Sequence, residues 1–140
     1  MKALFCGDRY WLSLNTIQHV FNWLEREMIP ITLLIEGECR GADLMSRFIA
    51  ERKGVPIMAF PAKWKEHGKA AGHIRNQQML DEGKPDIVVA FHADLATSKG
   101  TKDMINRSLK ANIDTWLHDG LIFKQLTWET FSRYLEPSVL

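Results

Sequence analysis

Residues 33–43 read LLIEGECRGAD, and this stretch decides the fold. Its first residues are apolar enough for a buried strand, and Gly37 and Gly41 then interrupt the pattern. A helical pattern of apolar residues begins at Ala42. A strand that runs through a glycine turn into a helix directs backbone N–H groups and the positive helix end at one point, which suits a phosphate. Taken alone, such glycines more often serve only the turn.

The same strand–loop–helix pattern recurs along the chain. Apolar strands are expected at residues 3–6, 31–35, 55–60, 86–91 and 113–117, with amphipathic helices at about 17–28, 41–53, 70–81 and 101–111. This alternation predicts one α/β domain over residues 1–140, with an open, mostly parallel sheet of about five strands and helices on both faces. Residues 118–140 are expected to form a C-terminal extension packed on it, with a short strand at 121–126 and a helix at 127–135.

Composition excludes several classes of protein. A chain of 140 residues with 46% hydrophobic and 25% charged residues fits one ordinary globular domain. No apolar run approaches the roughly 20 residues that a membrane-spanning helix needs. The N-terminal sequence MKALFCGDRYW lacks the apolar core and cleavage site of a signal peptide, so the cytoplasm is the expected compartment.

Cysteine, histidine and charge patterns argue against other kinds of site. Cys6 and Cys39 form no C-x-x-C pair and are interpreted as free thiols near a pocket. The five histidines show no metal-binding spacing, so we expect no metal and no cofactor. The net charge of +1 gives no support for nucleic-acid binding.

Ligands of open parallel sheets bind beyond the carboxyl ends of the strands. The loops at residues 7–9, 37–43, 62–76 and 98–101 all follow strands, so topology predicts that they meet at one edge. The residues expected to contact a ligand there are Gly7, Asp8, Arg9, Gly37, Gly41, Ala42, Asp43, Trp64, Gly72, Arg75, Asn76, Ser98, Gly100 and Thr101.

Each of these residue types has a functional and a structural interpretation. Arg9 and Arg75 suit an anion, although a lone arginine is most often a solvated surface group. Trp64 could stack on a base or pack its loop onto the domain. Residues 98–101 could cradle a phosphate or simply cap a helix. Asp43 could cap its own helix, or accept hydrogen bonds from ribose hydroxyls or from the loop backbone that shapes the pocket.

These loops, taken together and in this order, resemble the YspA-like branch of the SLOG superfamily, whose members are Rossmann-like domains that handle nucleotides and their derivatives. The similarity covers about residues 2–115. It rests on GDR at 7–9 with Trp11, EGECRGAD at 36–43, AKW at 62–64, Gly68 with Ala71-Gly72, Arg75-Asn76 with Met79, and SKGT at 98–101. The resemblance implies a three-layer Rossmann-like fold and a site for a nucleotide, nucleoside or ADP-ribose-like ligand. It also implies a homodimer or higher homo-oligomer, because SLOG relatives commonly form dimers.

The Lonely guy phosphoribohydrolases are better understood relatives, in which an arginine and the glutamate of P-G-G-x-G-T-x-x-E act on an N-glycosidic bond. Arg75 resembles that arginine, and Gly100-Thr101 resembles the phosphate-binding G-T. The first part of the glycine run is replaced here, and the glutamate position falls on Met104. Asp103 lies one residue earlier, which turns its side chain by about 100° on a helix. Arg75 and Asp103 are therefore the candidate catalytic residues.

Three functions follow from the resemblance. The first is binding of a nucleotide or nucleotide-derived ligand by a sensor or sequestering protein. The alternative is a hydrolase that cleaves the N-glycosidic bond of a nucleoside monophosphate or related nucleotide. The third is single-stranded nucleic-acid binding, since the DNA-processing protein DprA shares the superfamily, but the near-neutral charge disfavours it.

Overall fold

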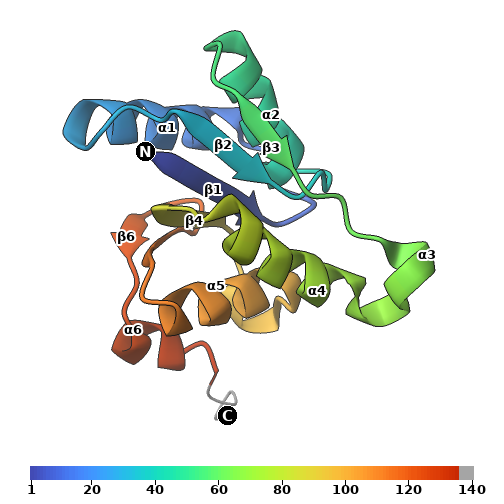
Figure 1. Cartoon of the computed structure of the whole chain (residues 1–140). Coiled ribbons are helices and arrows are strands. Elements are labelled where there is room, and N and C mark those ends of the chain that lie inside the picture. The colour runs from blue at the N-terminus through green and yellow to red at the C-terminus, as the bar shows by residue number, and fades with distance from the viewer. Residues whose placement is uncertain (136–140) are drawn as a thin grey trace.

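The computed structural model describes residues 1–135. These residues fold into one twisted sheet with helices on both faces (Figure 1). The six strands lie in the order β3-β2-β1-β4-β5-β6. Their bounds are Lys2–Gly7 (β1), Leu33–Glu36 (β2), Ile57–Ala59 (β3), Ile87–Phe91 (β4), Asp114–His118 (β5) and Phe123–Gln125 (β6). The first five run parallel, and β6 pairs antiparallel with β5. The α/β class with a mostly parallel sheet of five parallel strands is therefore confirmed, and β6 is the short added strand expected within residues 121–126.

The helices divide between the two faces of the sheet. Their bounds are Leu14–Glu27 (α1), Ala42–Arg52 (α2), Trp64–His67 (α3), Ala71–Gln78 (α4), Gly100–Lys110 (α5) and Trp128–Ser132 (α6). Helices α1 and α2 cover one face, whereas α4, α5 and α6 lie on the other (Figure 1). The chain therefore has the three layers of a Rossmann-like domain.

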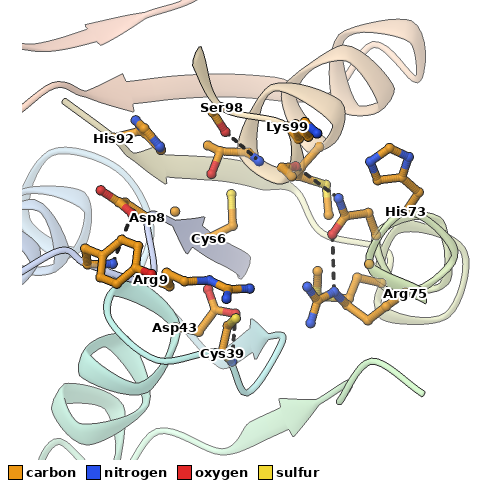
Figure 2. Close-up of a pocket in the computed structure, with 18 of the residues that line it drawn as sticks. Cys6, Asp8, Arg9, Cys39, Asp43, His73, Arg75, His92, Ser98 and Lys99 are labelled. Atoms are coloured by element: carbon orange, nitrogen blue, oxygen red, sulfur yellow. Dashed lines mark hydrogen bonds between the residues drawn. The ribbon is translucent and has the colours of Figure 1, made fainter. Parts of the chain in front are cut away.

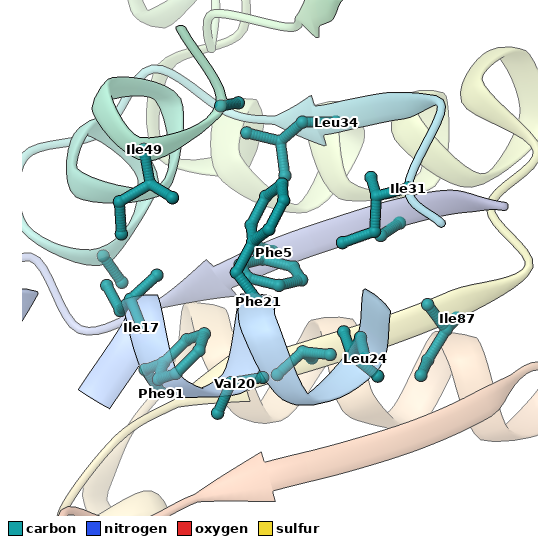
Figure 3. Packing of buried hydrophobic residues seen from close by; sticks show 14 of the residues in the cluster. Phe5, Ile17, Val20, Phe21, Leu24, Ile31, Leu34, Ile49, Ile87 and Phe91 are labelled. Atoms are coloured by element: carbon teal, nitrogen blue, oxygen red, sulfur yellow. The ribbon is translucent and has the colours of Figure 1, made fainter. Parts of the chain in front are cut away.

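Alternating strand residues build the two halves of the core. Ala3 and Phe5 of β1 point to the α1–α2 side, while Leu4 and Cys6 point to the α4–α5 side. Phe21 of α1 is fully buried on the first side, where its ring meets Phe5 at a centroid distance of 5.7 Å (Figure 3). Strand β4 is buried along its whole length because helices cover both of its faces.

Several boundaries differ from the sequence-based expectations, among them those of residues 61–72, of β3 and of the terminal helix. Residues 61–72 were expected to be a polar loop, but they contain α3 and a 3₁₀ turn at Gly68–Ala70. Both elements are short and polar, so the sequence shows no helical period of apolar residues there. Strand β3 is shorter than 55–60 because the Val55 N–H bonds to the Ala50 carbonyl and Pro56 has no N–H. The terminal helix ends at Ser132, before residue 135.

Two further expectations concern the last residues of the chain and membrane-spanning helices. The expected domain over 1–140 and its extension from 118 both include residues 136–140, which lie outside the described residues. Within residues 1–135, no helix has the length and apolar character needed to cross a membrane.

Truncation of Phe21 should destabilise the protein strongly. Phe21→Ala leaves a cavity between α1 and β1, so the free energy of unfolding should fall by about 3–5 kcal/mol. Phe48→Ala, on the outer face of α2 where the ring is 46% exposed, is the matched control and should change it by about 1 kcal/mol or less. Urea unfolding of both variants measures the difference, and equal losses would contradict the assigned core.

Candidate functional site

The strand order reverses between β1 and β4, so the loops that follow these two strands leave the sheet edge in opposite directions. A cavity of about 440 Å³ opens at this point (Figure 2). Its walls come from the end of β1, from the loops that follow β1, β2 and β4, and from the starts of α2, α4 and α5. This is the place where topology predicts a ligand in such a sheet.

Most of the expected ligand-binding residues meet at this cavity. The structure brings together Gly7, Asp8, Arg9, Asp43, Trp64, Gly72, Arg75, Asn76, Ser98, Gly100 and Thr101. It does not bring Gly37, Gly41, Ala42 or Asp103 into the lining. The lining also contains Cys6, Tyr10, Cys39, Lys69, His73, Met79, His92, Lys99 and Met104.

Two of these lining residues, Tyr10 and His92, were missed at the sequence level. His92 follows the last residue of β4, and Tyr10 follows the GDR turn after β1. The signal that could have found both is their place immediately beyond the carboxyl end of a parallel strand. Glycine and arginine motifs drew attention to neighbouring positions instead.

The glycines behind the lining allow the loops to pack against one another. A Cβ at Gly37 would overlap Nη1 of Arg75 and would lie 2.9 Å from Oδ2 of Asp43. Gly41 has a positive φ of 76°, and a Cβ there would overlap the Asp8 carbonyl oxygen. The lack of a side chain at Gly37 therefore lets Arg75 and Asp43 approach this loop closely, and the lack of one at Gly41 does the same for the loop after β1.

Arg75 is held entirely by neutral oxygen atoms. Its Nη1 donates to the carbonyl oxygens of Gly37 at 2.5 Å and Phe60 at 3.4 Å, and its Nε donates to Oδ1 of Asn76 at 3.2 Å. No carboxylate in residues 1–135 forms an ion pair with it. The guanidinium thus lines the cavity with its orientation fixed and its charge not neutralised by a protein partner.

The start of α5 also lines the cavity, next to Arg75. The Ser98 hydroxyl accepts hydrogen bonds from the N–H groups of Thr101 at 3.1 Å and Lys102 at 3.4 Å, so Ser98 caps this helix. Residues 98–101 nevertheless all line the cavity. The positive end of an eleven-residue helix therefore faces the space beside Arg75.

Asp103 and Asn76 connect α4 to α5 behind this wall. The Asn76 amide donates to the Gly100 carbonyl oxygen at 3.2 Å and to Oδ2 of Asp103 at 3.0 Å. The same Asp103 oxygen accepts from Nε of Arg107 at 2.8 Å, and Nδ1 of His73 lies 3.8 Å from the other oxygen. Asp103 is therefore engaged between the helices, and Asn76 links Arg75 to the start of α5.

Asp43 is the most perturbed acid of the cavity. It is only 4% exposed, and its Oδ2 accepts a hydrogen bond from the Cys39 N–H at 3.1 Å. Burial raises the pKa of Asp43 from 3.8 to about 7, against the lowering effects of the Arg75 charge and the Cys39 N–H, while the nearby Glu36 raises it further. This carboxyl group therefore exchanges its proton near neutral pH.

Both cysteines are free and line the cavity, as the sequence suggested. The buried Cys6 thiol donates weakly to the Val89 carbonyl oxygen at 3.7 Å, and burial raises its pKa above the usual range. In the described part of the chain, no group of three or more His, Cys, Asp and Glu side chains is arranged to hold a metal ion.

Comparison with known proteins identifies the family. The family described as "YspA, cpYpsA-related SLOG family" matches residues 1–67. The Gene 61 protein of Mycobacterium phage D29 is 30% identical over 118 residues, which cover 80% of this chain and 91% of that protein. The chain belongs to the YspA, cpYpsA-related SLOG family.

A solved SLOG structure supports the fold. The chain is similar to DNA processing protein A (DprA) from Streptococcus pneumoniae, with a TM-score of 0.63 and 17% sequence identity. The match covers 83% of this chain and 49% of the DprA chain, so this chain spans about half the length of DprA. At this identity the likeness shows the shared fold alone.

The raised pKa of Asp43 predicts a pH-dependent stability. Because the folded state favours the protonated carboxyl, ionisation costs stability as pH rises from near 4 through about 7. The stability of the wild type relative to Asp43→Asn should therefore fall between about pH 4 and pH 7 and level off above pH 7. Urea unfolding of both proteins at each pH measures this, and a difference that stays constant with pH would contradict the assigned environment.

Proposed function

We propose that this SLOG domain binds a nucleotide or a nucleotide-derived, ADP-ribose-like ligand at the C-terminal edge of its sheet, as a sensor or sequestering protein. The observation that carries the proposal is the environment of Arg75. A guanidinium held by carbonyl oxygens, without a carboxylate partner in residues 1–135, keeps its charge available for a ligand anion. Phosphate is the anion that matches its planar fork.

The surroundings of Arg75 support the same ligand. Lys69, Lys99 and the start of α5 add positive potential on the same side of the cavity. The cavity volume of about 440 Å³ lies in the range of small-molecule sites. Membership of the SLOG family agrees with a nucleotide-related role.

Two aromatic side chains favour a ligand that carries a base. Trp64 is 53% exposed and Tyr10 is 69% exposed, yet both line the cavity. Exposed aromatic rings beside a cationic site offer flat surfaces on which a base can stack. We therefore assign the base to the rim of the cavity and the phosphate to its Arg75 side.

Loss of the Arg75 guanidinium should weaken binding without unfolding the domain. Arg75→Gln removes the charge from the phosphate position and should weaken the binding of AMP or ADP-ribose by about tenfold or more. Arg52→Gln is the matched control, because Arg52 lies on α2 over the exposed Phe48 ring. Isothermal titration calorimetry measures both variants, and equal affinity in Arg75→Gln and wild type would refute the assignment.

The second candidate function is hydrolysis of an N-glycosidic bond, and the environment of Asp43 favours it. In this reaction water adds to C1′ of the ribose while the C1′–N bond breaks and its electron pair goes to the base. A protonated carboxyl gives its proton to the departing base and regains one from the water. Asp43, with a pKa of about 7, suits this exchange, whereas Asp103 is engaged by Arg107 and lies outside the lining.

Turnover separates the hydrolase from the binding protein. Incubation of the protein with nucleoside monophosphates should release free base and ribose 5-phosphate if the site is catalytic, and Asp43→Asn and Arg75→Gln should abolish the release. Chromatography of the mixture measures both products. Recovery of a bound nucleotide intact after long incubation would exclude hydrolysis and leave the binding function in place.

A further inference from the structure

The charged side chains of the cavity lie on two different walls. Figure 2 shows Asp8 and Asp43 on one side and His73 and Arg75 on the other. The exposed Arg9 also belongs to the first side, so that side is mixed, whereas Lys99 joins the second. A phosphate is attracted to the second wall and is repelled by carboxylates on the first.

Each acid on the first wall keeps one oxygen atom free for a ligand. Oδ2 of Asp43 accepts the Cys39 N–H, and Oδ1 of Asp8 accepts the Tyr10 N–H at 3.0 Å. The Gly37 N–H also lies close enough to the Asp43 carboxylate to lower its pKa. Within residues 1–135, the side-chain hydrogen bonds with defined geometry reach Oδ2 of Asp43 and Oδ1 of Asp8, which leaves Oδ1 of Asp43 and Oδ2 of Asp8 for a ligand. The side chain of Asp43 is more than nine-tenths buried yet lines the cavity, so its free oxygen can be reached only from there.

The acid at the end of β2 cannot serve the ligand in this protein. In dinucleotide-binding folds an acid near this position bonds the ribose hydroxyls. Here Glu36 is fully buried and outside the lining, and its Oε2 accepts the Glu38 N–H at 2.6 Å. Its Oε1 has no hydrogen-bond partner and lies 3.7 Å from Nη1 of Arg47. The carboxylates that line the cavity are therefore those of Asp8 and Asp43.

Carboxylate oxygens that lack donors suit neighbouring hydroxyl groups. We propose that Asp43 and Asp8 accept hydrogen bonds from the 2′ and 3′ hydroxyls of a ribose whose phosphate lies against Arg75 and the start of α5. The site then selects ribonucleotides over 2′-deoxyribonucleotides. This inference rests on the proposed function, because it needs the phosphate at Arg75 to orient the sugar.

The selection should depend on pH through Asp43. Only the ionised carboxylate accepts hydrogen bonds at both oxygens, one from Cys39 and one from the ribose. Burial raises the pKa of Asp43 to about 7. The Arg75 charge on α4 lowers this pKa, and Glu36 on β2 raises it further. The buried Cys6 thiol of β1 is the other titratable group beside Asp43. The preference for ribose should therefore grow as pH rises from about 6 to about 8.

The test compares matched ligand pairs. AMP, GMP, CMP and UMP are each titrated beside their 2′-deoxy counterparts (dUMP for UMP), and ribose 5-phosphate beside 2-deoxyribose 5-phosphate. At about pH 8 the wild-type protein should bind the ribose member of its best pair about tenfold more tightly, the effect of one hydrogen bond to a charged group. Using the ratio within a pair cancels the titration of the phosphate itself.

Variants assign the selection to the two acids. Asp43→Asn and Asp8→Asn should each lower the ratio toward one while retaining affinity for the deoxy compound, because Arg75 is unchanged. Asp81 is an exposed acid in the π-helical turn at Met79–Gly83 that follows α4, and it lies outside the cavity lining. Asp81→Asn is therefore the matched control and should keep the wild-type ratio. Asp8→Asn serves as the second variant if Asp43→Asn fails to fold by circular dichroism.

The possible outcomes separate this inference from the proposed function. Equal affinity of the wild-type protein for ribose and deoxyribose members would overturn the inference while leaving nucleotide binding intact. A ratio that survives in both Asp43→Asn and Asp8→Asn would also overturn it. Absence of binding to every compound would overturn the proposed function and the inference together.

Discussion

The close approach of Gly7 to Phe91 at the carboxyl ends of β1 and β4 is the constraint on which the site depends. The two residues are paired in the sheet, and the next N–H along, that of Asp8, donates to the Phe91 carbonyl oxygen at 2.8 Å. A Cβ at Gly7 would overlap that oxygen and would lie 2.9 Å from Cβ of Ala42. Only glycine lets β4 and the start of α2 meet β1 at this point.

This contact fixes the wall of the cavity that carries Asp8 and Asp43. The N–H of Ala42 donates to the Asp8 carbonyl oxygen at 3.2 Å, which ties the first turn of α2 to the loop after β1. Asp43 follows directly and therefore faces the same cavity as Asp8. Two loops that are more than thirty residues apart thus act as one surface.

The cationic wall is fixed by a separate chain of hydrogen bonds. Gly37 and Phe60 hold the Arg75 guanidinium, and Asn76 joins Arg75 to Gly100 and Asp103 at the start of α5. Since the donors and the charge are oriented before a ligand arrives, binding requires little rearrangement of these groups. The two walls together give the cavity a polarity that matches a phosphorylated sugar.

The sequence predicted the parts of this structure that depend on local periodicity. The strand–turn–helix of residues 33–43 and the apolar β4 identified a parallel sheet, and the loops predicted to meet beyond its strands line one cavity. The three-residue β6 and the polar α3 are too short for their periods to fix their bounds. Gly37 contacts Arg75, which lies 38 positions away in the sequence, and Asp103 contacts Asn76, which lies 27 positions away. No local sequence pattern encodes such contacts.

Nuclear magnetic resonance of the ¹⁵N-labelled protein during titration with AMP and with ADP-ribose tests the central claim most directly. A nucleotide that enters the cavity should shift the backbone amides of Gly7, Gly72, Gly100 and Thr101 and leave those of α1 and α6 unchanged. The account predicts saturable shifts confined to these strand ends and helix starts. Saturable shifts centred on α1, α6 or the opposite edge of the sheet would contradict it.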